Sequence, residues 1–208
     1  MRQMYKVFFK DRIIFFESNF SEVFKSNTGL FYRYRSKMEL NSIISAYYDL
    51  TKIHRLYLFH NDLDFLWEEF KSVFRYIPAA GGILKNQNDE YLVIKRNGIW
   101  DLPKGKAEKG ESMVETAVRE VSEECGLDNI IAGDELTTTY HTYKIDDQLV
   151  LKETKWFRMS IEHKATPSPQ TKEGITEVKW VKENGFGFMK NNTYGSVLDV
   201  LEAEGIGN

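Results

Sequence analysis

The chain has little of what several protein classes require. Its 208 residues include one cysteine, Cys125, which excludes an internal disulfide and a zinc site built on cysteines. The formal net charge is only −3, and the absence of a basic block makes nucleic acid an unlikely partner and disfavours anionic membrane surfaces. No apolar run approaches the roughly 18 residues of a membrane helix, and charged residues interrupt every apolar run near the N-terminus. We therefore expect a soluble, cytoplasmic protein without a signal peptide.

The composition is sufficient for a folded core and suggests two parts. Hydrophobic residues make up 42% of the chain and aromatic residues 14%, which suits one large domain or two small ones. The amino-acid composition changes near Ile77-Pro78, where a run of two alanines and two glycines follows. We place a small α/β domain of unknown role at residues 1–75 and a second domain at residues 77–208. The aromatic density of the first part is compatible with homodimer formation, with shaping a pocket, or with restricting access to one.

Apolar periodicity and turn residues predict the elements of both parts. Strands are expected at residues 5–9, 13–16, 55–59, 79–85, 91–96, 137–145, 150–160 and 177–181. Helices are expected at residues 36–50, 61–74, 113–125 and 194–204. This alternation predicts an α/β (α+β) protein in which strands lie on either side of a central helix.

The central helix lies in the most informative segment of the chain, Gly105 to Leu127, which reads GKAEKGESMVETAVREVSEECGL. Ser112 and Glu115 form a capping box that should begin the helix at Met113, and Gly126 is suited to end it. Four apolar residues recur at spacings of four, three and four and predict the face that packs against a core. These residues are Val114, Val118, Val121 and Cys125.

The same helix carries three carboxylates within five residues, Glu120, Glu123 and Glu124, which we expect on the opposite face. Such a cluster is costly unless a cation lies among the acids, and a hard divalent metal that holds a phosphate chain is the natural occupant. Arg119 could clamp its acidic neighbours and fix their rotamers. The structural alternative is an ordinary solvated helix with Glu/Arg pairs.

The spacing of this segment resembles the Nudix box. That signature consists of glycine, five residues, glutamate, seven residues, Arg-Glu, an aliphatic residue, any residue, Glu-Glu, any residue, glycine and an aliphatic residue. The matching positions are Gly105, Glu111, Arg119, Glu120, Val121, Glu123, Glu124, Gly126 and Leu127. The resemblance implies a Nudix-type α/β/α sandwich with a mixed sheet over about residues 77–208. It also implies hydrolysis of a nucleoside diphosphate linked to another group, by attack of water on phosphorus.

By the same resemblance, the cofactor is Mg²⁺ or Mn²⁺ held by carboxylates. Glu120 and Glu124 are the implied metal ligands, and Glu123 is a third or water-mediated one. The carbonyl of Gly105 is a further implied ligand. A carboxylate must also accept the proton of the attacking water. Some Nudix members take this base from the signature helix, where Glu120 and Glu123 are the candidates here.

Other Nudix members take the base from a distal loop, where we favour Glu173, with Glu177 second. Either residue could equally be a solvated loop acid. Arg119 is implied to orient the glutamates, as a catalytic residue that does not touch substrate. Glu111 is implied to position the loop or a metal-bound water, and its alternative is a simple acid at a helix N-terminus, favoured by the dipole.

Substrate contacts are expected from lysines and aromatic residues. Lys104 and Lys106 flank Gly105 and could grip the distal phosphates of a long chain, or they could be exposed loop residues. Tyr140 and Tyr143 could stack on a base, although aromatic residues at alternating strand positions more often belong to a core.

The Pro-Lys-Gly-Lys run resembles that of Nudix members acting on long phosphate chains: dinucleoside polyphosphates, diphosphoinositol polyphosphates and capped RNA ends. Members of the ADP-ribose type usually carry proline where this chain has Tyr143, so we favour a dinucleoside polyphosphate or a related long-chain nucleotide. The net charge gives capped RNA little support. The alternative is a non-catalytic nucleotide sensor with a Nudix fold, and the intact set of box acids favours the enzyme over the sensor.

Overall fold

The computed structural model describes residues 5–146, 148–162 and 166–206, and the chain divides into two compact units. The first unit comprises Met1–Tyr76 and Tyr140–Lys152, and the second comprises Ile77–Thr139 and Glu153–Asn208. Residues 140–152 include the last part of β9 (Ile131–Ile145) and the first part of β10 (Gln148–Ile161), the two strands of a hairpin that the sequence placed entirely in the second part. The structure packs this hairpin end with the first unit instead, because its apolar residues enter the core there.

In the first unit, β1 and β2 are antiparallel, whereas β2, β4 and β3 run parallel in that spatial order. The end of β9 joins β1 in parallel through the pairs Val7 with Tyr140 and Phe8 with His141. The elements are β1 (Lys6–Phe9), β2 (Arg12–Glu17), α1 (Phe20–Ser26), β3 (Leu30–Arg33), α2 (Lys37–Asp49), β4 (Arg55–Phe59) and α3 (Leu63–Lys71). The predicted strands and the helices α2 and α3 are confirmed, whereas α1 and β3 were not predicted.

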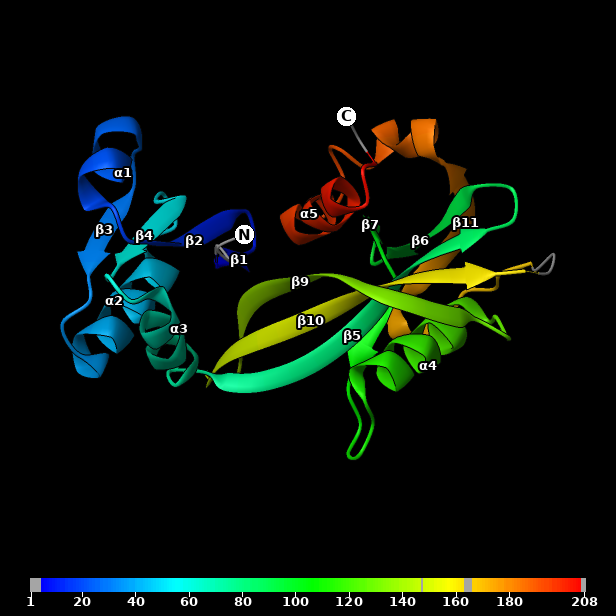
Figure 1. Ribbon diagram of the computed structural model, residues 1–208, viewed down its shortest axis with the longest axis horizontal. Coiled ribbons are helices and arrows are strands. Elements are labelled where there is room, and N and C mark those ends of the chain that lie inside the picture. The colour runs from blue at the N-terminus through cyan, green and yellow to red at the C-terminus, as the bar shows by residue number, and fades with distance from the viewer. Residues whose placement is uncertain (1–4, 147, 163–165, 207–208) are drawn as a thin grey trace. The chain divides into compact units, whose positions relative to one another are not determined.

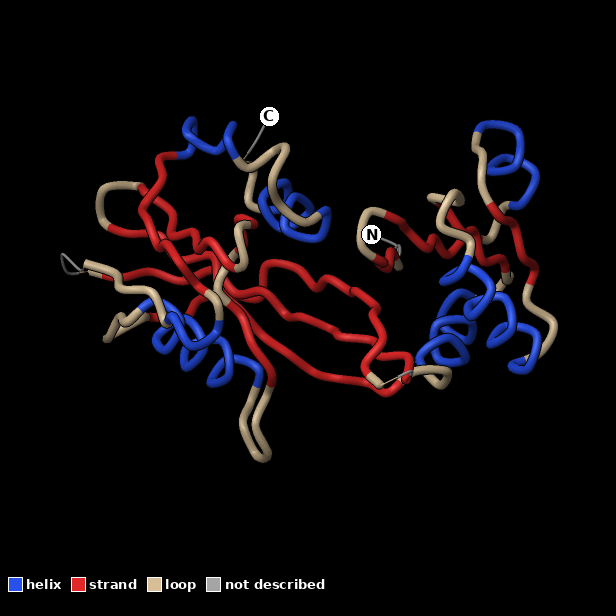
Figure 2. Tube along the Cα trace, turned by 180° about the vertical axis from the view of Figure 1, so that it is seen from behind, coloured by secondary structure: helices blue, strands red, loops and turns tan. Residues whose placement is uncertain are grey.

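The core of the first unit lies between its strands and the pair of helices α2 and α3. Figure 2 shows these two helices lying next to each other. Alternate strand residues such as Ile14, Phe16 and Leu56 are buried against these helices. The short helix α1 instead contributes Phe20 and Phe24 to a ring cluster on the other face. None of its residues is buried, which explains why apolar periodicity did not reveal it.

The second unit is built around a mixed sheet in the order β11-β6-β5-β10-β9, with β7 on β6 and β8 on β5. Its strands are β5 (Arg75–Asn86), β6 (Glu90–Arg96), β7 (Ile99–Asp101), β8 (Lys104–Lys106), β9 (Ile131–Ile145), β10 (Gln148–Ile161) and β11 (Ile175–Lys182). Its helices are α4 (Met113–Cys125) and α5 (Gly195–Ala203). The predicted elements are confirmed, and the short strands β7 and β8 were not predicted.

Alternation along the strands gives this sheet two apolar faces. Tyr91 and Val93 of β6 point into a cluster with α5, whereas Leu92 and Ile94 point into a cluster with α4. Figure 1 accordingly shows α4 and α5 on opposite sides of the strands. The predicted sandwich of a mixed sheet between helices is therefore confirmed.

Helix α4 begins and ends as its sequence predicts. The hydroxyl of Ser112 accepts a hydrogen bond from the Glu115 amide, and the Glu115 carboxylate accepts one from the Ser112 amide, which completes the capping box. Gly126 ends the helix in the left-handed conformation, with φ 62°. The predicted apolar face needs a correction, because Val114 is 40% exposed and Ala117 takes the buried position. The expectation that the three acids share the opposite face is also wrong, because Glu120 and Glu124 are buried.

No helix in the described part of the chain is long and apolar enough to cross a membrane.

Replacing Ser112 with alanine should lower the free energy of unfolding by about 1 kcal/mol, because it removes the side-chain half of the capping box. The measurement is urea denaturation followed by circular dichroism. Ser42→Ala is the matched control, since the Ser42 hydroxyl only donates to Met38 O inside α2. Equal losses in the two variants would contradict a specific role for the cap.

Candidate active site

The site forms where β8 passes the middle of α4. Backbone pairing of Gly105 with Ala80 of β5 holds β8 in the sheet, and the buried face of α4 presents Glu120 to it. A β-carbon at position 105 would overlap the Glu120 carboxylate. Glycine fits this close approach of side chain to backbone, which brings two of the predicted ligands together.

Arg119 is the centre of the outer part of the site. Its Nε and Nη2 donate to the two oxygens of Glu111 at 2.6 and 3.0 Å, a bidentate pair. Its Nη1 donates to Glu120 at 2.9 Å and to Glu123 at 3.3 Å, and Nη2 also donates to Lys106 O at 3.0 Å. Arg119 therefore fixes three carboxylates and the end of β8, as the predicted orienting role requires.

Glu111 joins the loop before α4 to the helix itself. Its carboxylate accepts hydrogen bonds from the Glu108 amide and from the Thr116 hydroxyl, each at 2.9 Å. The hydrogen bonds from Arg119, followed by that from Glu108, lower the pKa of Glu111 to about 2. The carboxylate is thus held ionised as a positioning group for the loop, and its predicted action on a metal-bound water stays a prediction.

Glu124 lies deeper than the other acids of the helix, with 0% of its surface exposed. Burial raises the pKa of Glu124 to about 7, and the charges of Arg96 and Lys104 oppose that rise. Arg96 Nη2 donates to one Glu124 oxygen, and the Lys104 amide donates to the other at 3.1 Å. Arg96, at the end of β6, was not singled out from the sequence, because only the fold brings it to α4.

The segment after β10 closes over the end of α4. The amides of Ser168 and Gln170 donate to the carbonyls of Cys125 and Glu124 at 2.8 and 3.1 Å. This docking leads the chain into the 3₁₀ turn Thr171–Glu173 and places the Glu173 carboxylate 3.4 Å from Arg96 Nη2. The structure therefore brings the favoured distal acid to the ion pair of Glu124.

Glu177, the second candidate for the base, lies on β11. It is exposed, and the structure shows it 3.9 Å from Lys179 on the same strand. Its ion pair therefore involves neither arginine of the site.

The ion pairs of the site join more acids than bases. Three cationic side chains, Arg96, Lys104 and Arg119, serve six carboxylates, so the acids outnumber the bases by two to one. The six are Asp101, Glu111, Glu120, Glu123, Glu124 and Glu173.

Within the described residues, however, no three His, Cys, Asp or Glu side chains are grouped as a metal site. The predicted set of Glu120, Glu123 and Glu124 is thus not assembled as one ligand group. The arginines hold these carboxylates apart: Glu124 is buried against Arg96, while Glu123 points outward to Arg119.

The two lysines beside Gly105 differ in their surroundings. Lys104 donates to the buried carboxylate of Asp101, and its ammonium also lies 6.0 Å from the centre of the Trp156 ring. Its charge is already matched inside the protein, so the predicted grip on phosphates would require this ion pair to open. Lys106 is exposed and keeps a side chain that can reach a ligand.

The predicted aromatic contacts lie in the first unit. Tyr140 is buried and packs edge-on against Trp67 with the ring centres 4.6 Å apart, so the structure makes it a core residue. Tyr143 is half-buried, and its ring stacks on His141 at 5.3 Å.

Tyr194 is a further aromatic residue that the sequence did not mark. Residue Thr193 donates to Trp100 O at 2.7 Å and so anchors the start of α5 beside β7. Tyr194 is 43% exposed. Burial and the charge of Asp101 raise the pKa of its phenol, whereas Arg96 lowers it.

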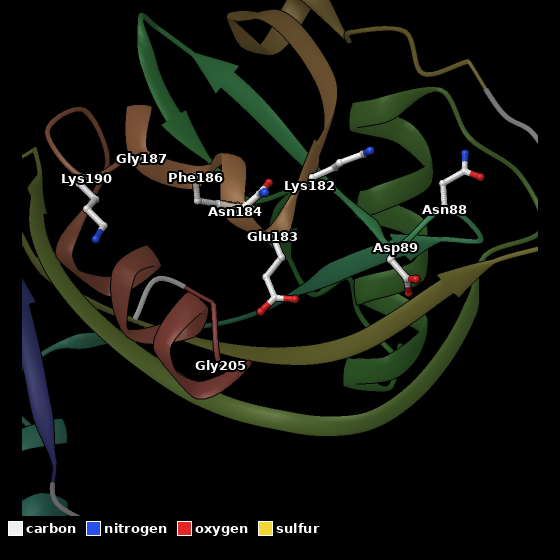
Figure 3. A pocket seen from close by; sticks show the side chains of 9 residues that line it. All are labelled: Asn88, Asp89, Lys182, Glu183, Asn184, Phe186, Gly187, Lys190 and Gly205. Atoms are coloured by element: carbon white, nitrogen blue, oxygen red, sulfur yellow. The ribbon is translucent and has the colours of Figure 1, made fainter.

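The second unit also has a cavity of about 610 Å³ that contains none of the predicted site residues (Figure 3). It lies between the turn at Asn88 and Asp89 and the segment that follows β11. Lys182 and Lys190 face it together with Glu183, so acids and bases are mixed there and no single charge dominates.

The chemistry and geometry of the α4 site agree with a comparison to protein families. The model of the NUDIX domain matches residues 75–197, and this range includes all the residues of the α4 site. The chain belongs to the NUDIX domain family. The match begins at β5, so most of the first unit lies outside the family domain.

Relatives and solved structures extend this finding. The RNA pyrophosphohydrolase of Roseobacter denitrificans is 30% identical over 153 residues, which cover 62% of this chain and 92% of that protein. The mRNA decapping complex subunit 2 of Schizosaccharomyces pombe is 40% identical over 68 residues, covering 29% of this chain and 9% of that protein. The chain spans less than half the length of the first curated relatives that it matches.

The MutT protein of Methanosarcina mazei Go1 has a similar fold, with a TM-score of 0.50 and 24% identity. The alignment covers 62% of this chain and 92% of that one. This similarity shows the fold of the second unit.

Replacing Gly105 with alanine should lower the free energy of unfolding by about 1–3 kcal/mol, because the new methyl group overlaps the Glu120 carboxylate in a closely packed site. Urea denaturation measures this loss. Gly187→Ala is the matched control, since a β-carbon there meets no atom within 4 Å, and it should change stability by less than about 0.5 kcal/mol. An unchanged Gly105→Ala protein would show that β8 and α4 are less tightly packed than described.

Proposed function

We propose that the chain is a divalent-metal-dependent pyrophosphohydrolase, which cleaves a nucleoside diphosphate linked to another group by attack of water at phosphorus. The observation that carries the proposal is that six carboxylates outnumber the three cationic side chains that serve them at the Nudix helix. Such an excess favours the binding of a hard cation. Membership of the NUDIX family supports the same class of reaction.

The residues of the site fit Mg²⁺ or Mn²⁺ in their chemistry. Glu120 and Glu124 supply carboxylate oxygens, the preferred donors for hard cations. The absence of a side chain at Gly105 leaves the Glu120 carboxylate against the backbone, and we assign the Gly105 carbonyl as a further donor. Glu123 is the third or water-mediated ligand. When bound, the metal neutralises charge on the phosphate oxygens and lowers the pKa of water.

The remaining residues orient these groups and move the proton. Arg119 holds Glu120 at 2.9 Å, and the bidentate pair with Glu111 fixes its guanidinium. We assign the role of general base to Glu173, because the loop that carries it is docked on α4. Its carboxylate would accept the proton of the attacking water.

We infer that the substrate is a dinucleoside polyphosphate or a related long-chain nucleotide. Lys106 is exposed beside Gly105 and can neutralise distal phosphates. Tyr194 offers a partly exposed ring near Arg96 and Asp101 for stacking on a base. The names of two relatives favour a second candidate, the 5′ end of RNA, which also carries a chain of phosphates.

A nucleotide sensor that binds without turnover is the other functional class. The chain retains every acid of the signature, and Arg119 holds three of them in place. The intact set of acids therefore favours the enzyme over the sensor.

Glu124→Gln should reduce metal-dependent turnover by on the order of a thousandfold, about 4 kcal/mol of barrier, because a charged ligand becomes a neutral amide. The assay measures phosphate and nucleotide release with Mg²⁺ or Mn²⁺. Its substrates are diadenosine polyphosphates, nucleoside triphosphates, ADP-ribose and a 5′-triphosphate RNA, and the best of them identifies the substrate class.

Glu202→Gln serves as the control for this test, since Glu202 is exposed on α5 and should retain full activity. Circular dichroism and thermal melting establish that both variants are folded. If the wild type turns over no substrate but still binds nucleotide, the chain is a sensor. If Glu124→Gln keeps wild-type turnover, the metal-ligand assignment is wrong.

Glu173→Gln should lower kcat by about a hundredfold or more with little change in KM, because general-base catalysis typically contributes that much. Glu177→Gln, the same change on β11, should stay within about twofold. Steady-state kinetics on the best substrate distinguishes the two. A larger loss at Glu177 would reverse the assignment, and a loss at neither would place the base on α4.

A further inference from the structure

Arg96 lies at the site but has no role in the proposed hydrolysis. It is the last residue of β6, and its backbone is paired with Ile175 of β11. The following residue, Asn97, donates from its amide to Gly174 O at 2.9 Å. These bonds attach Arg96 to the strand that continues from the Glu173 loop, while its side chain reaches across to Glu124.

Only part of the hydrogen-bonding capacity of the Arg96 guanidinium is used among the described residues. The single nitrogen Nη2 donates to both Glu124 and Glu173. Its Nε is buried and, among the described residues, has no hydrogen-bond partner. A guanidinium that binds a carboxylate with one nitrogen is held less firmly than a bidentate pair such as Arg119 with Glu111. Arg96 can therefore be displaced at a lower cost than Arg119.

Glu124, by contrast, depends on Arg96. The ammonium of Lys104 is engaged by Asp101, so the Lys104 residue offers Glu124 its backbone amide instead. Arg96 is the one side chain with which Glu124 forms an ion pair in the part of the chain that the structure describes. A buried carboxylate left without a counter-charge is strongly unfavourable. Any cation that binds Glu124 in place of Arg96 must therefore supply the positive charge that Arg96 supplies.

We propose that Arg96 is a built-in competitor of the metal: it neutralises Glu124 in the metal-free protein, and a divalent cation binds Glu124 by displacing it. This inference rests on the proposed function. Arg96 is thus a positioning residue that sets the metal affinity of the site. Two consequences follow: the metal-free site stays folded despite its acids, and the site fills only when the cation concentration is high enough to overcome the ion pair.

The test is Mn²⁺ binding measured by electron paramagnetic resonance, with the metal alone and no substrate, at pH 8.5 to reduce proton competition at Glu124. Arg96→Met should bind Mn²⁺ about tenfold more tightly than the wild type, because a like charge beside the metal is removed. A residue that merely supports the fold would weaken binding when replaced. Arg96→Lys retains the charge and should stay within about threefold of the wild type.

Arg158→Met is the matched control, since Arg158 also forms an ion pair with a glutamate, Glu204 at 2.7 Å, in the same unit. It should leave Mn²⁺ affinity unchanged. If Arg96→Met does not fold, the wild type decides the question by NMR with Mg²⁺. One arginine Nε–Hε resonance, absent from Arg96→Lys, must then shift as the metal binds.

The outcomes separate this proposal from the one on which it rests. If the wild type binds Mn²⁺ and Glu124→Gln does not, the metal site is established. Unchanged or weaker binding by Arg96→Met, or an unmoved arginine resonance, would then overturn the competition alone. If the wild type binds no Mn²⁺, both proposals fail together.

Discussion

Mutual repulsion among carboxylates is the constraint on which the second unit depends. Six acids converge at α4, and three cationic side chains serve them. Arg119 forms a bidentate ion pair with Glu111 and also donates to Glu120 and Glu123, which are the outer acids. Arg96 donates to the buried Glu124 through a single nitrogen. The two arginines divide the site into a firmly held outer part and a displaceable inner part. This division follows the burial of the acids, because Glu124 is fully buried whereas Glu123 is half exposed.

Backbone geometry makes the convergence possible. The short strand β8 exists because its amides and carbonyls pair with β5, and that pairing places glycine opposite Glu120. At the other end of α4, two helix carbonyls accept hydrogen bonds from the segment after β10, which satisfies groups that a helix end leaves unpaired. The same bonds bring Glu173 to Arg96. Sheet, helix end and loop therefore position the acids together, and no one element would do so alone.

Local signals predicted the fold well where they were strong. The capping box and Gly126 defined both ends of α4, and the strand predicted at residues 91–96 is β6, which the structure buries on both faces. Val114 was misassigned because periodicity alone placed it inside, whereas in the first turn of the helix Met113 packs against the core and Val114 is exposed. Helix α1 and strand β3 were missed because they are short and α1 buries no side chain. The hairpin of β9 and β10 was predicted, but its packing with the first unit depends on pairing with β1, far away in the sequence.

The sequence by itself determined the signature acids, the helix that carries them and the family, because all of these depend on spacing within 23 residues of the segment Gly105 to Leu127. Only the tertiary structure decided the partners of those acids. Arg96 is 28 residues from Glu124 and 77 from Glu173 along the chain, and Lys104 is turned to Asp101 instead of toward a ligand. The burial of Tyr140 in a core was likewise decided by the tertiary structure. Charge pairing and burial depend on distances in space, and only the packing of β6, β8 and the Glu173 loop around α4 sets those distances.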